Sequence, residues 1–475
     1  MLTSLDFLAL FAFVFLANFA VRSRPKWRNA LLLVAGYGFY ANWSLLFFAV
    51  LMFVSALHFY LAQEIAKAEY RDEQYIHQTI GGVMAAAVIV AMAQFHRIAP
   101  FLGDYAWLTG SLVGEGGAVN PFPIGAFFFF LQSYSYLADV SRGRYVPYEN
   151  LNDYHLYVSF FPRIAVGPMV SADVFRPQLT EPRGKLKPEG LGVAVFLIIA
   201  GTIKATVIAE YLSLNVVDKV FDLPTLFSTT EVIVAVYGNA LALYLKLAGL
   251  TDLAVAMSLL LGFELPANFD FPYQALNLRD FWARWMMPLT AWLRDYVYAP
   301  MTGSAGAPLF RRAAATLATL LIVALAWGWK WTLVLWAVLQ AVGLIVTRWA
   351  QARGQGTGIR SNTSLLSRGV RRLLVFHFVV ISWTIFTVAD WQTLSDMVSI
   401  LPLQIWEAPN LTPMAVGLVV VALLGAWMPR NLFLKGREMF SRAPLAVHIG
   451  AIILLVFILM EAAQTGEIPF VYERL

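Results

Sequence analysis

The sequence has no cysteine and few charged residues, and each shortage excludes a class of protein. Without cysteine, the 475-residue chain can form neither a disulfide framework nor a reactive thiolate. Charged residues make up only 13% of the chain and hydrophobic residues 59%, whereas an ordinary soluble domain has about 25% charged residues. The mean hydropathy is +0.66. We therefore predict a helical membrane protein that crosses the bilayer many times.

Other shortages limit the fold and the partners further. The apolar runs are long and unbroken rather than alternating, which disfavours a transmembrane β-barrel. The net charge is only +5, and basic cytoplasmic loops account for it, so we expect no nucleic-acid partner. We also expect no metal site. The N-terminus lacks the basic start and the small-residue cleavage site of a signal peptide, so we expect its apolar run to remain as a span.

Hydrophobic runs predict about twelve membrane spans, because a helix needs roughly 20 apolar residues to cross the bilayer. The candidates are 5–21, 30–62, 80–95, 98–112, 121–137, 191–210, 231–262, 313–327, 331–348, 373–389, 412–428 and 445–462. The run 30–62 is long enough for one long span or two short ones.

Charged loops predict the orientation of the chain. The loop 348–372 has six arginines and no acid, and the loop 429–444 has four basic residues and one acid. The link 390–411 has three acids and no base, and four basic residues closely follow the first span. By the positive-inside rule, we expect both basic loops in the cytoplasm and both chain termini on the outer side.

Two stretches do not fit a membrane span. Residues 268–303 place arginines and aspartates among tryptophans and tyrosines, and each charge would cost several kcal/mol in hydrocarbon. Residues 152–179 contain Pro162, Gly167 and Pro168, which interrupt a helix. Irregular backbone at membrane depth is tolerated only inside protein or beside a water-filled cavity. We therefore predict that both stretches are re-entrant or in-plane around a polar internal site.

Six segments, in order, resemble a known family. They are PIGAFFFFLQSYSYLADVSRGR (123–144), YVSFFPRIAVGPMVSADVFRPQL (157–179), LAGLTDLAVAMSLLLGFELPANFDFPY (247–273), FWARWMMPLTAWLRDYVYAPMTG (281–303), WTLVLWAVLQ (331–340) and PFVYERL (469–475). They resemble the membrane-bound O-acyltransferases, above all the bacterial branch of alginate O-acetylation and teichoic-acid D-alanylation. The resemblance implies an all-α bundle of about twelve helices around a central funnel. It also implies one domain over 1–475, with its core at 121–348.

The two signature histidines of that family are absent at the positions that match its patterns. The first, in the pattern FWRRWH, falls on Met286, and the second, which is taken as the catalytic base, falls on Trp327. Neither methionine nor tryptophan accepts a proton near neutral pH. In the family mechanism a histidine removes the hydroxyl proton as the hydroxyl attacks an acyl thioester. That mechanism cannot run here through these two positions.

The resemblance also implies a donor, partners and a location. The donor would be acyl-CoA or another acyl thioester from the cytoplasm, with no bound cofactor. The acceptor hydroxyl would arrive from the other side or from the membrane. Besides the lipid bilayer, the implied partners are an acyl carrier and a periplasmic acetyl-transferring or SGNH-type protein. The chain is expected in the bacterial inner membrane.

Three titratable residues are candidates to replace the missing histidines. His155 lies just before the SFFP segment and is the best-placed histidine, and His377 lies within a predicted span. Asp252 keeps the aspartate of the family's SGYSD segment. For each histidine the alternative is an ordinary packed or interfacial side chain.

Four further charged residues are candidates to line the funnel. Asp295 keeps the aspartate of the WLRDY segment, and the alternative role for it is a buried ion pair with Arg284 or Arg294. Arg163 could bind a phosphate of the carrier, because arginine binds phosphate oxygens with two donors. The alternative for Arg163 is a helix-end arginine that extends its head group to the membrane surface.

The sequence leaves three functions open. The first is an O-acyltransferase of the cell envelope, which would acetylate an exopolysaccharide or a similar polymer. The second is an inactive family member that serves as a scaffold or an acyl conduit for a partner, which the loss of both histidines favours. The third is a transporter, although no paired half-helix pattern supports it. Neither the acyl group nor its acceptor can be read from these residues.

Overall fold

The computed structural model describes residues 5–43, 45–68, 79, 82–83, 124–164, 167–181, 188–303, 306–327, 330–352 and 364–464. Every regular element in these residues is a helix, so the predicted all-α class is confirmed. By their internal contacts the residues form two compact units. The first comprises Met1–Ala194 with Ala254–Pro266, and the second comprises Val195–Leu253 with Ala267–Arg474.

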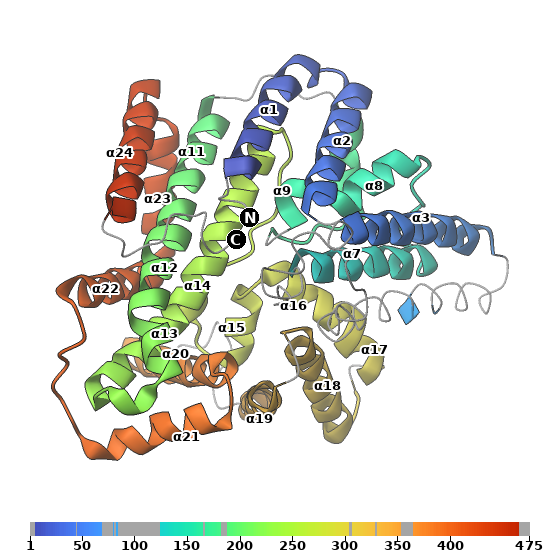
Figure 1. Ribbon diagram of the computed structural model, residues 1–475. Coiled ribbons are helices and arrows are strands. Elements are labelled where there is room, and N and C mark those ends of the chain that lie inside the picture. Colours follow the sequence, from blue (N-terminus) through green and yellow to red (C-terminus); the bar gives the residue numbers. More distant parts are fainter. Residues whose placement is uncertain are drawn as a thin grey trace, which may run out of the picture. The chain divides into compact units, whose positions relative to one another are not determined.

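The first unit is built from long hydrophobic helices and three short ones. Its helices are α1 (Leu5–Val21), α2 (Pro25–Trp43), α3 (Leu45–Lys67), α7 (Ile124–Ser141), α8 (Leu151–Ser159), α9 (Phe161–Ile164) and α10 (Ala172–Thr180). α3 and α7 run side by side, and α2 and α3 both pack on α8 (Figure 1). The run 30–62 is therefore two helices. The predicted spans 80–95 and 98–112 lie outside the described residues, apart from 82–83.

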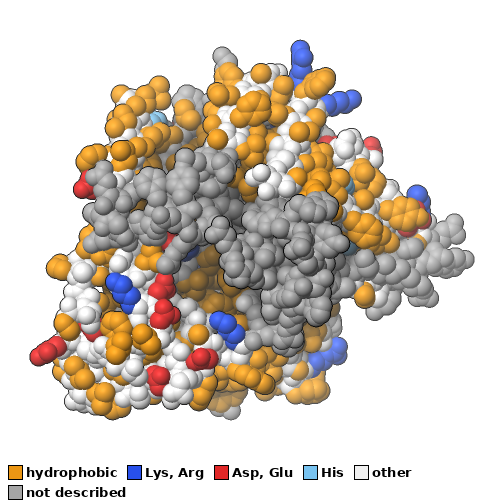
Figure 2. All heavy atoms as spheres, viewed as in Figure 1, with side chains coloured by type: hydrophobic (Ala, Val, Ile, Leu, Met, Phe, Trp, Pro, Cys, Tyr) orange, Lys and Arg blue, Asp and Glu red, His pale blue; other side chains and the backbone are white. Residues whose placement is uncertain are grey.

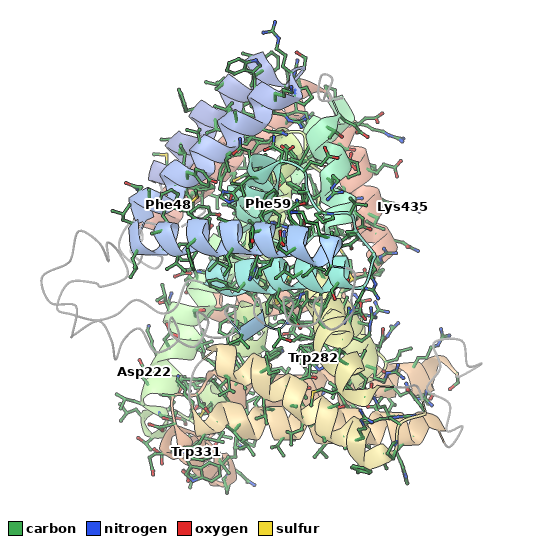
Figure 3. All side chains as sticks on the ribbon, turned by 90° about the vertical axis from the view of Figure 1, so that its right-hand side faces the viewer. Phe48, Phe59, Asp222, Trp282, Trp331 and Lys435 are labelled. Atoms are coloured by element: carbon green, nitrogen blue, oxygen red, sulfur yellow. The ribbon has the colours of Figure 1, made fainter. Side chains whose placement is uncertain are left out.

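Four buried tyrosines form the core of the first unit, where α7 meets α8. The rings of Tyr136, Tyr148, Tyr154 and Tyr157 lie 4.8 to 6.2 Å apart, measured between centroids. Phe59 of α3, labelled in Figure 3, packs against Tyr154 at 6.0 Å. Rings of this size supply much of the buried apolar area of a core. The short helix α8 is thus held in the protein interior by its own aromatic side chains.

The second unit begins with a pair of long helical stretches and ends with α24. Its elements are α11 (Pro188–Thr202), η4 (Ile203–Ile208), α12 (Ala209–Leu212), η5 (Ser213–Val217), α13 (Asp218–Asp222), η6 (Pro224–Leu226), α14 (Thr229–Leu260), η7 (Pro272–Gln274), α15 (Leu278–Arg284), α16 (Met287–Leu293), η8 (Arg294–Tyr298), α17 (Ala299–Thr302), α18 (Leu309–Trp327), α19 (Trp331–Ala352), α20 (Leu365–Thr387), α21 (Trp391–Ile400), η9 (Leu401–Leu403), α22 (Pro413–Trp427), α23 (Arg430–Ser441) and α24 (Leu445–Gln464). α11 begins in the first unit and α14 ends there. α18 and α19 pack side by side, and α19 also packs on α20 (Figure 1).

Several helices are long and apolar enough to cross a bilayer. In the described residues they are Leu45–Lys67, Glu189–Asp222, Thr229–Leu260, Trp331–Gln351 and Leu366–Thr387. Large hydrophobic side chains are exposed along α24, at the upper left of Figure 2. A hydrophobic exterior of this kind suits a lipid environment. The count of about twelve spans stays a prediction.

A sharp bend joins α22 to α23. The two helices pass the length and hydropathy test for a span only as a pair, and they are bent by 96°. Gln274 donates hydrogen bonds to the carbonyls of Ala426 and Met428, at 3.2 and 2.7 Å, where α22 ends. The prediction of a loop at 429–444 is wrong in this respect, because most of it is the basic helix α23. The loop was predicted from its basic residues, and an amphipathic helix has such residues as well.

The two irregular stretches are broken, as predicted. Within 152–179, α8 ends at Ser159, the short helix α9 follows, and the non-helical residues 167–171 precede α10. Pro162 occupies the first turn of α9, where its missing N–H removes no hydrogen bond. Within 268–303 the backbone forms five short helical pieces instead of one span. Their re-entrant or in-plane placement and the central funnel remain predictions.

Candidate functional site

Met286 lies at a sharp break between α15 and α16. The side chain of Asn277 accepts a hydrogen bond from the Asp280 N–H and begins α15, which ends at Arg284. Met286 then takes a left-handed conformation, with φ 41° and ψ 57°, and α16 begins at the next residue. This conformation costs a residue with a side chain about 1–2 kcal/mol. Strain of this kind collects at functional sites, where the surrounding structure holds it in place.

A neighbouring segment holds the break in place. The Met287 N–H donates to the Asn268 carbonyl at 2.8 Å, and the Asp270 N–H donates to the Arg284 carbonyl at 3.0 Å. Phe271, next to this pairing, is also left-handed, with φ 46°. The Asn268 side chain donates to the Thr251 hydroxyl at 3.1 Å, on α14. A hydrogen-bonded path thus leads from the break at Met286 to the residue beside Asp252.

Asp252 itself is neutralised by a lysine. Its carboxylate lies 2.8 Å from the Lys204 ammonium, in the π-helical turn η4. A second ion pair joins the same two helical stretches, with the lysine, Lys246, now on α14 and the acid, Glu210, on the other stretch. A side chain on Gly201 would come within 2.7 Å of the Gly249 carbonyl, so glycine permits this close approach of the two backbones. The predicted aspartate is therefore in place, but as one half of an ion pair.

The arginines near the break pair differently from the prediction. Arg284 binds Asp280 at 2.7 Å and Asp270 at 3.9 Å. Asp270 also binds Arg430, at the start of α23, at 2.8 Å. Sequence spacing signalled none of the pairs made by Asp270.

The predicted buried ion pair of Asp295 is only half right. Asp295 does pair with Arg294, at 2.7 Å, but the two side chains are 42% and 66% exposed. The prediction of burial is therefore wrong, because the π-helical turn η8 leaves both neighbours on its outer side. An exposed pair of this kind contributes at most about 1 kcal/mol.

A series of aromatic rings connects the two positions that lack histidine. The ring of Trp285, the neighbour of Met286, lies 4.8 Å from that of Trp383 of α20, measured between centroids. Trp383 lies 5.4 Å from Phe386, which lies 5.5 Å from Trp327 at the end of α18.

The two ends of this series differ in exposure. Met286 is 8% exposed and Trp327 is 44% exposed.

Trp282 of α15, labelled in Figure 3, packs on this series, and the rings of Trp282, Trp285, Trp336, Trp383 and Phe386 together form a wall. Its indole N–H donates to the Gln340 side chain at 3.1 Å, and its ring lies 6.1 Å from that of Trp336. The indole N–H group of Trp336 is buried and finds no acceptor in the described residues. A donor left without a partner in a buried wall is uncommon in folded proteins. Only the tertiary structure shows it.

His155 is buried in the first unit, on α8. The residue is 3% exposed, and its Nδ1 is hydrogen-bonded to the Tyr37 hydroxyl of α2. Its other ring nitrogen, Nε2, is buried and has no hydrogen-bond partner in the described residues. Burial lowers the pKa of His155 to about 4. The ring is therefore neutral near pH 7, and Tyr37 is a partner that the sequence did not indicate.

Arg163 is also buried in the first unit, on α9. It is 4% exposed, so the alternative of an arginine that reaches the membrane surface is wrong. Its Nη2 donates to the Tyr157 carbonyl at 2.6 Å, whereas Nη1 has no partner in the described residues. Gly167 donates its N–H to the Arg163 carbonyl at 2.7 Å, and a side chain there would collide with the backbone of Arg163. The glycine of this segment thus permits the tight turn around Arg163.

His377 of α20 is an exposed packing residue. Its Nδ1 is hydrogen-bonded to the carbonyl of Leu373, one turn earlier, and its ring meets Tyr237 and Phe376 edge-on. These contacts of His377 include none of the other candidate residues of the second unit. In the described residues, no cluster of three or more histidines and carboxylates could hold a metal ion. Of the candidates, His155 and Arg163 lie in the first unit and the others lie in the second.

Helices of span length, a broken polar segment and a wall of buried tryptophans define a multi-pass membrane protein with polar groups inside it. The model of the membrane-bound O-acyltransferase family matches residues 30–387. The chain belongs to the membrane-bound O-acyltransferase family.

Individual relatives match most of the chain. A probable alginate O-acetylase of Pseudomonas putida is 27% identical over 98% of this chain and 98% of its own. A probable alginate O-acetylase of Pseudomonas syringae pv. tomato is 30% identical over 80% of this chain and 71% of its own. The peptidoglycan O-acetyltransferase of Helicobacter pylori is 25% identical over 80% of this chain and 76% of its own. The family resemblance of the six sequence segments is thereby confirmed.

Proposed function

We propose that this protein transfers acetyl groups from a thioester donor to hydroxyl groups of a cell-envelope polymer. The observation that carries the proposal is the extent of the match to relatives named as O-acetylases and an O-acetyltransferase, which covers 80% to 98% of the chain. The family match at residues 30–387 includes parts of both compact units. An active family member is therefore the function that these observations support best.

The reaction forms one ester bond and breaks one thioester bond. The acceptor hydroxyl oxygen attacks the acetyl carbonyl carbon, the carbon–sulfur bond breaks, and the sulfur leaves as a thiol. The hydroxyl proton passes to a base and finally to the sulfur, so no oxidant or reductant is required. A general base typically accelerates such a step 10²–10⁴-fold. Since Met286 and Trp327 cannot act as bases, the chain needs another proton acceptor.

His155 is the better candidate for that acceptor. When its Nδ1–H donates to the Tyr37 oxygen, its buried Nε2 carries a free lone pair. A partner on one ring nitrogen sets which tautomer is present, as in many catalytic histidines. Asp252 is less suited, because the ammonium of Lys204 already compensates its charge. Its role is better explained as the link between η4 and α14.

The location follows from the proposed reaction. An acetyl thioester made in the cytoplasm and a polymer outside require an enzyme in the inner membrane, with a passage for the acetyl group. The basic residues of the segments 348–372 and 429–444 support a cytoplasmic position for those segments. On this orientation both termini are outside. An acyl carrier and a periplasmic acetyl-transferring protein are the partners that this reaction could use.

Reconstitution of the purified chain tests the proposal. The chain would be placed in liposomes with acetyl-CoA, and release of free thiol and formation of acetyl ester would be measured on alginate and on peptidoglycan fragments. The Pseudomonas putida relative serves as the positive control. Acetyl ester formation at a rate within about tenfold of the relative is expected. No ester with any acceptor or donor would instead support the inactive scaffold or conduit, for which the comparisons offer no support.

A further inference from the structure

Arg163 carries a buried positive charge that the described chain does not neutralise. The side chain is 4% exposed, and its electrostatic partners in the described residues are tyrosines rather than carboxylates. Burial lowers the pKa of Arg163 to about 10, so it remains a cation at neutral pH. Removing an unpaired charge from water costs several kcal/mol after relaxation of the protein. An energetic cost of this size suggests that the buried charge has a functional role.

A second buried arginine of the same unit shows how the fold neutralises such a group. Arg28 is 0% exposed and lies over the ring of Phe263. Its Nη2 donates to the carbonyls of Gln178 and Leu179 at 2.8 and 2.9 Å, and its Nη1 donates to the Glu181 carbonyl at 3.1 Å. These carbonyls belong to the C-terminal end of α10, which is the negative end of the helix dipole. Arg28 is therefore satisfied by the protein itself.

Arg163 has no comparable set of acceptors. Its Nη2 donates to the Tyr157 carbonyl, which also accepts from Gln132, while Nη1 finds no acceptor in the described residues. The rings of Phe175 and Tyr157 lie 5.7 and 5.9 Å from the guanidinium carbon. Such cation–π contacts contribute about 2 kcal/mol when the site is dry. They reduce the cost of burial without providing a counter-charge.

The tyrosines around Arg163 supply no charge either. The side chains that interact electrostatically with Arg163 are Tyr40 of α2, Tyr148 and Tyr157. The Tyr40 hydroxyl donates to the Ser159 carbonyl at 3.0 Å, and the Tyr157 hydroxyl donates to the Val170 carbonyl at 3.1 Å. Both hydroxyls are therefore occupied as donors and stay neutral. A ligand would meet one free guanidinium nitrogen in an aromatic, low-dielectric setting.

A second polar atom without a partner lies nearby along the chain. His155 Nε2 belongs to α8, and Arg163 Nη1 belongs to α9, which follows after one residue. Both residues meet α2, His155 through Tyr37 and Arg163 through Tyr40. Buried polar groups without partners are rare, and two on one short stretch suggest that a ligand completes them. His155 can accept or donate one hydrogen bond, and Arg163 can bind an anion.

We infer that Arg163 is a binding site for an oxyanion, a phosphate or a carboxylate, between α2, α8 and α9. The free Nη1 of the guanidinium suits both groups, because its N–H groups can donate charge-assisted hydrogen bonds to their oxygens. Resting on the proposed function, the two sources of such an anion are a phosphate of the thioester donor and a carboxylate of the acceptor polymer. The binding itself does not depend on turnover, so it can be tested separately.

The test is thermal unfolding of the purified full chain in detergent, with tryptophan fluorescence as the readout. Sodium phosphate and sodium acetate are added separately, and sodium chloride at equal ionic strength is the reference. A ligand that binds only the folded state raises the melting temperature. We expect phosphate or acetate to raise the melting temperature of the natural protein. A larger rise with phosphate would indicate the thioester donor as the source of the anion, and a larger rise with acetate would indicate the acceptor polymer. No rise with either anion would overturn the inference.

Two substitutions make the assignment to Arg163 specific. Arg163→Met keeps the length of the side chain, removes the unpaired charge, and should abolish the anion response while the ligand-free protein melts no lower than the natural one. Arg163→Lys keeps the positive charge but replaces the planar guanidinium by an ammonium, and about tenfold weaker anion binding is expected. Arg294→Met, at an exposed arginine, should keep the full response. A normal response in the Arg163→Met protein, or a large loss of its ligand-free stability, would show that Arg163 is structural.

Discussion

The rings of Trp285 and Trp383 lie 4.8 Å apart, and this contact joins the break at Met286 to helix α20. Trp383 is 3% exposed and also lies within 6.4 Å of Phe281, Trp336 and Phe386. Offset or tilted ring pairs of this kind add about 0.5–1.5 kcal/mol each to the burial of apolar area. The wall of rings therefore positions the strained residue more firmly than its own short helices could.

The first prediction concerns this wall. Replacement of a buried tryptophan by alanine removes apolar contacts and leaves a cavity, so Trp383→Ala should lower the free energy of unfolding by about 3–5 kcal/mol. Trp391→Ala is the matched control, because that indole is 65% exposed, and its effect should stay within about 0.5 kcal/mol. Denaturation in mild detergent measures both. Equal losses in the two variants would mean that the wall does not stabilise the second unit.

The second prediction concerns the backbone at Met286. Alanine and glycine both remove the buried side chain, but glycine adopts φ 41° without strain. Met286→Gly should therefore be more stable than Met286→Ala by about 1 kcal/mol. At Met287, which is helical, the order should reverse, with alanine ahead by about 0.5–1 kcal/mol. The same order at both positions would show that residue 286 is not held in the left-handed conformation.

The third prediction concerns the proton acceptor. If His155 is the base, His155→Gln should lower the acetyl transfer rate by about 10²–10⁴-fold, and Tyr37→Phe should lower it less. Because only the tautomer and orientation of the ring change, Tyr37→Phe should mainly affect kcat. His377→Gln should leave the rate unchanged, since that ring is exposed and bound within its own helix. Full activity of the His155→Gln protein would remove His155 from the mechanism.

A rescue experiment extends the third prediction. The double substitution Met286→His and Trp327→His places histidine at both positions that match the family patterns. It should restore part of the activity lost in the His155→Gln protein, because imidazole is then available again. Trp327 can be tested alone with Trp327→Phe, which keeps an aromatic ring against Phe386. Loss of folding in the double variant would be recognised by its fluorescence before any assay.

The fourth prediction concerns pH. The pKa of His155 is about 4 in the folded protein and near 6.5 when the ring is free. Because the folded state disfavours the protonated ring, the stability linked to His155 is complete above pH 6.5 and is lost as pH falls from 6.5 towards 4. The natural protein should therefore lose more stability over this interval than His155→Gln. Parallel curves for the two proteins would contradict the burial of a neutral imidazole.

The fifth prediction concerns the pair formed by Lys204 and Asp252. Asp252→Asn leaves a half-buried ammonium without its partner, at a cost of about 1–3 kcal/mol. The exchange Lys204→Asp with Asp252→Lys should recover most of that stability, because it restores opposite charges in the same place. If Asp252 were instead the base, the exchanged protein would be stable but inactive. Measuring stability and turnover on the same samples separates a structural role from a chemical one.

Some features of the site could be predicted from the sequence. Charges among tryptophans at 268–303, and Pro162 and Gly167 in the other stretch, are local signals, and both stretches are broken in the structure. The burial of Arg163 and the exposure of Asp295 could not be predicted, because each depends on which elements pack over the residue. Charge in the segment 429–444 likewise could not tell a loop from the helix α23.

The sequence by itself determined that this is an all-helical membrane protein, where most hydrophobic helices begin and end, and to which family the chain belongs. Those properties follow from composition, from runs of neighbouring residues and from short patterns. The tertiary structure alone decided that Tyr37 meets His155, that Asp270 links Arg284 to Arg430, and that Arg163 is buried without a counter-charge. The physical reason is distance along the chain: these residues come from separate segments, so their hydrogen bonds and burial exist only after the segments have packed.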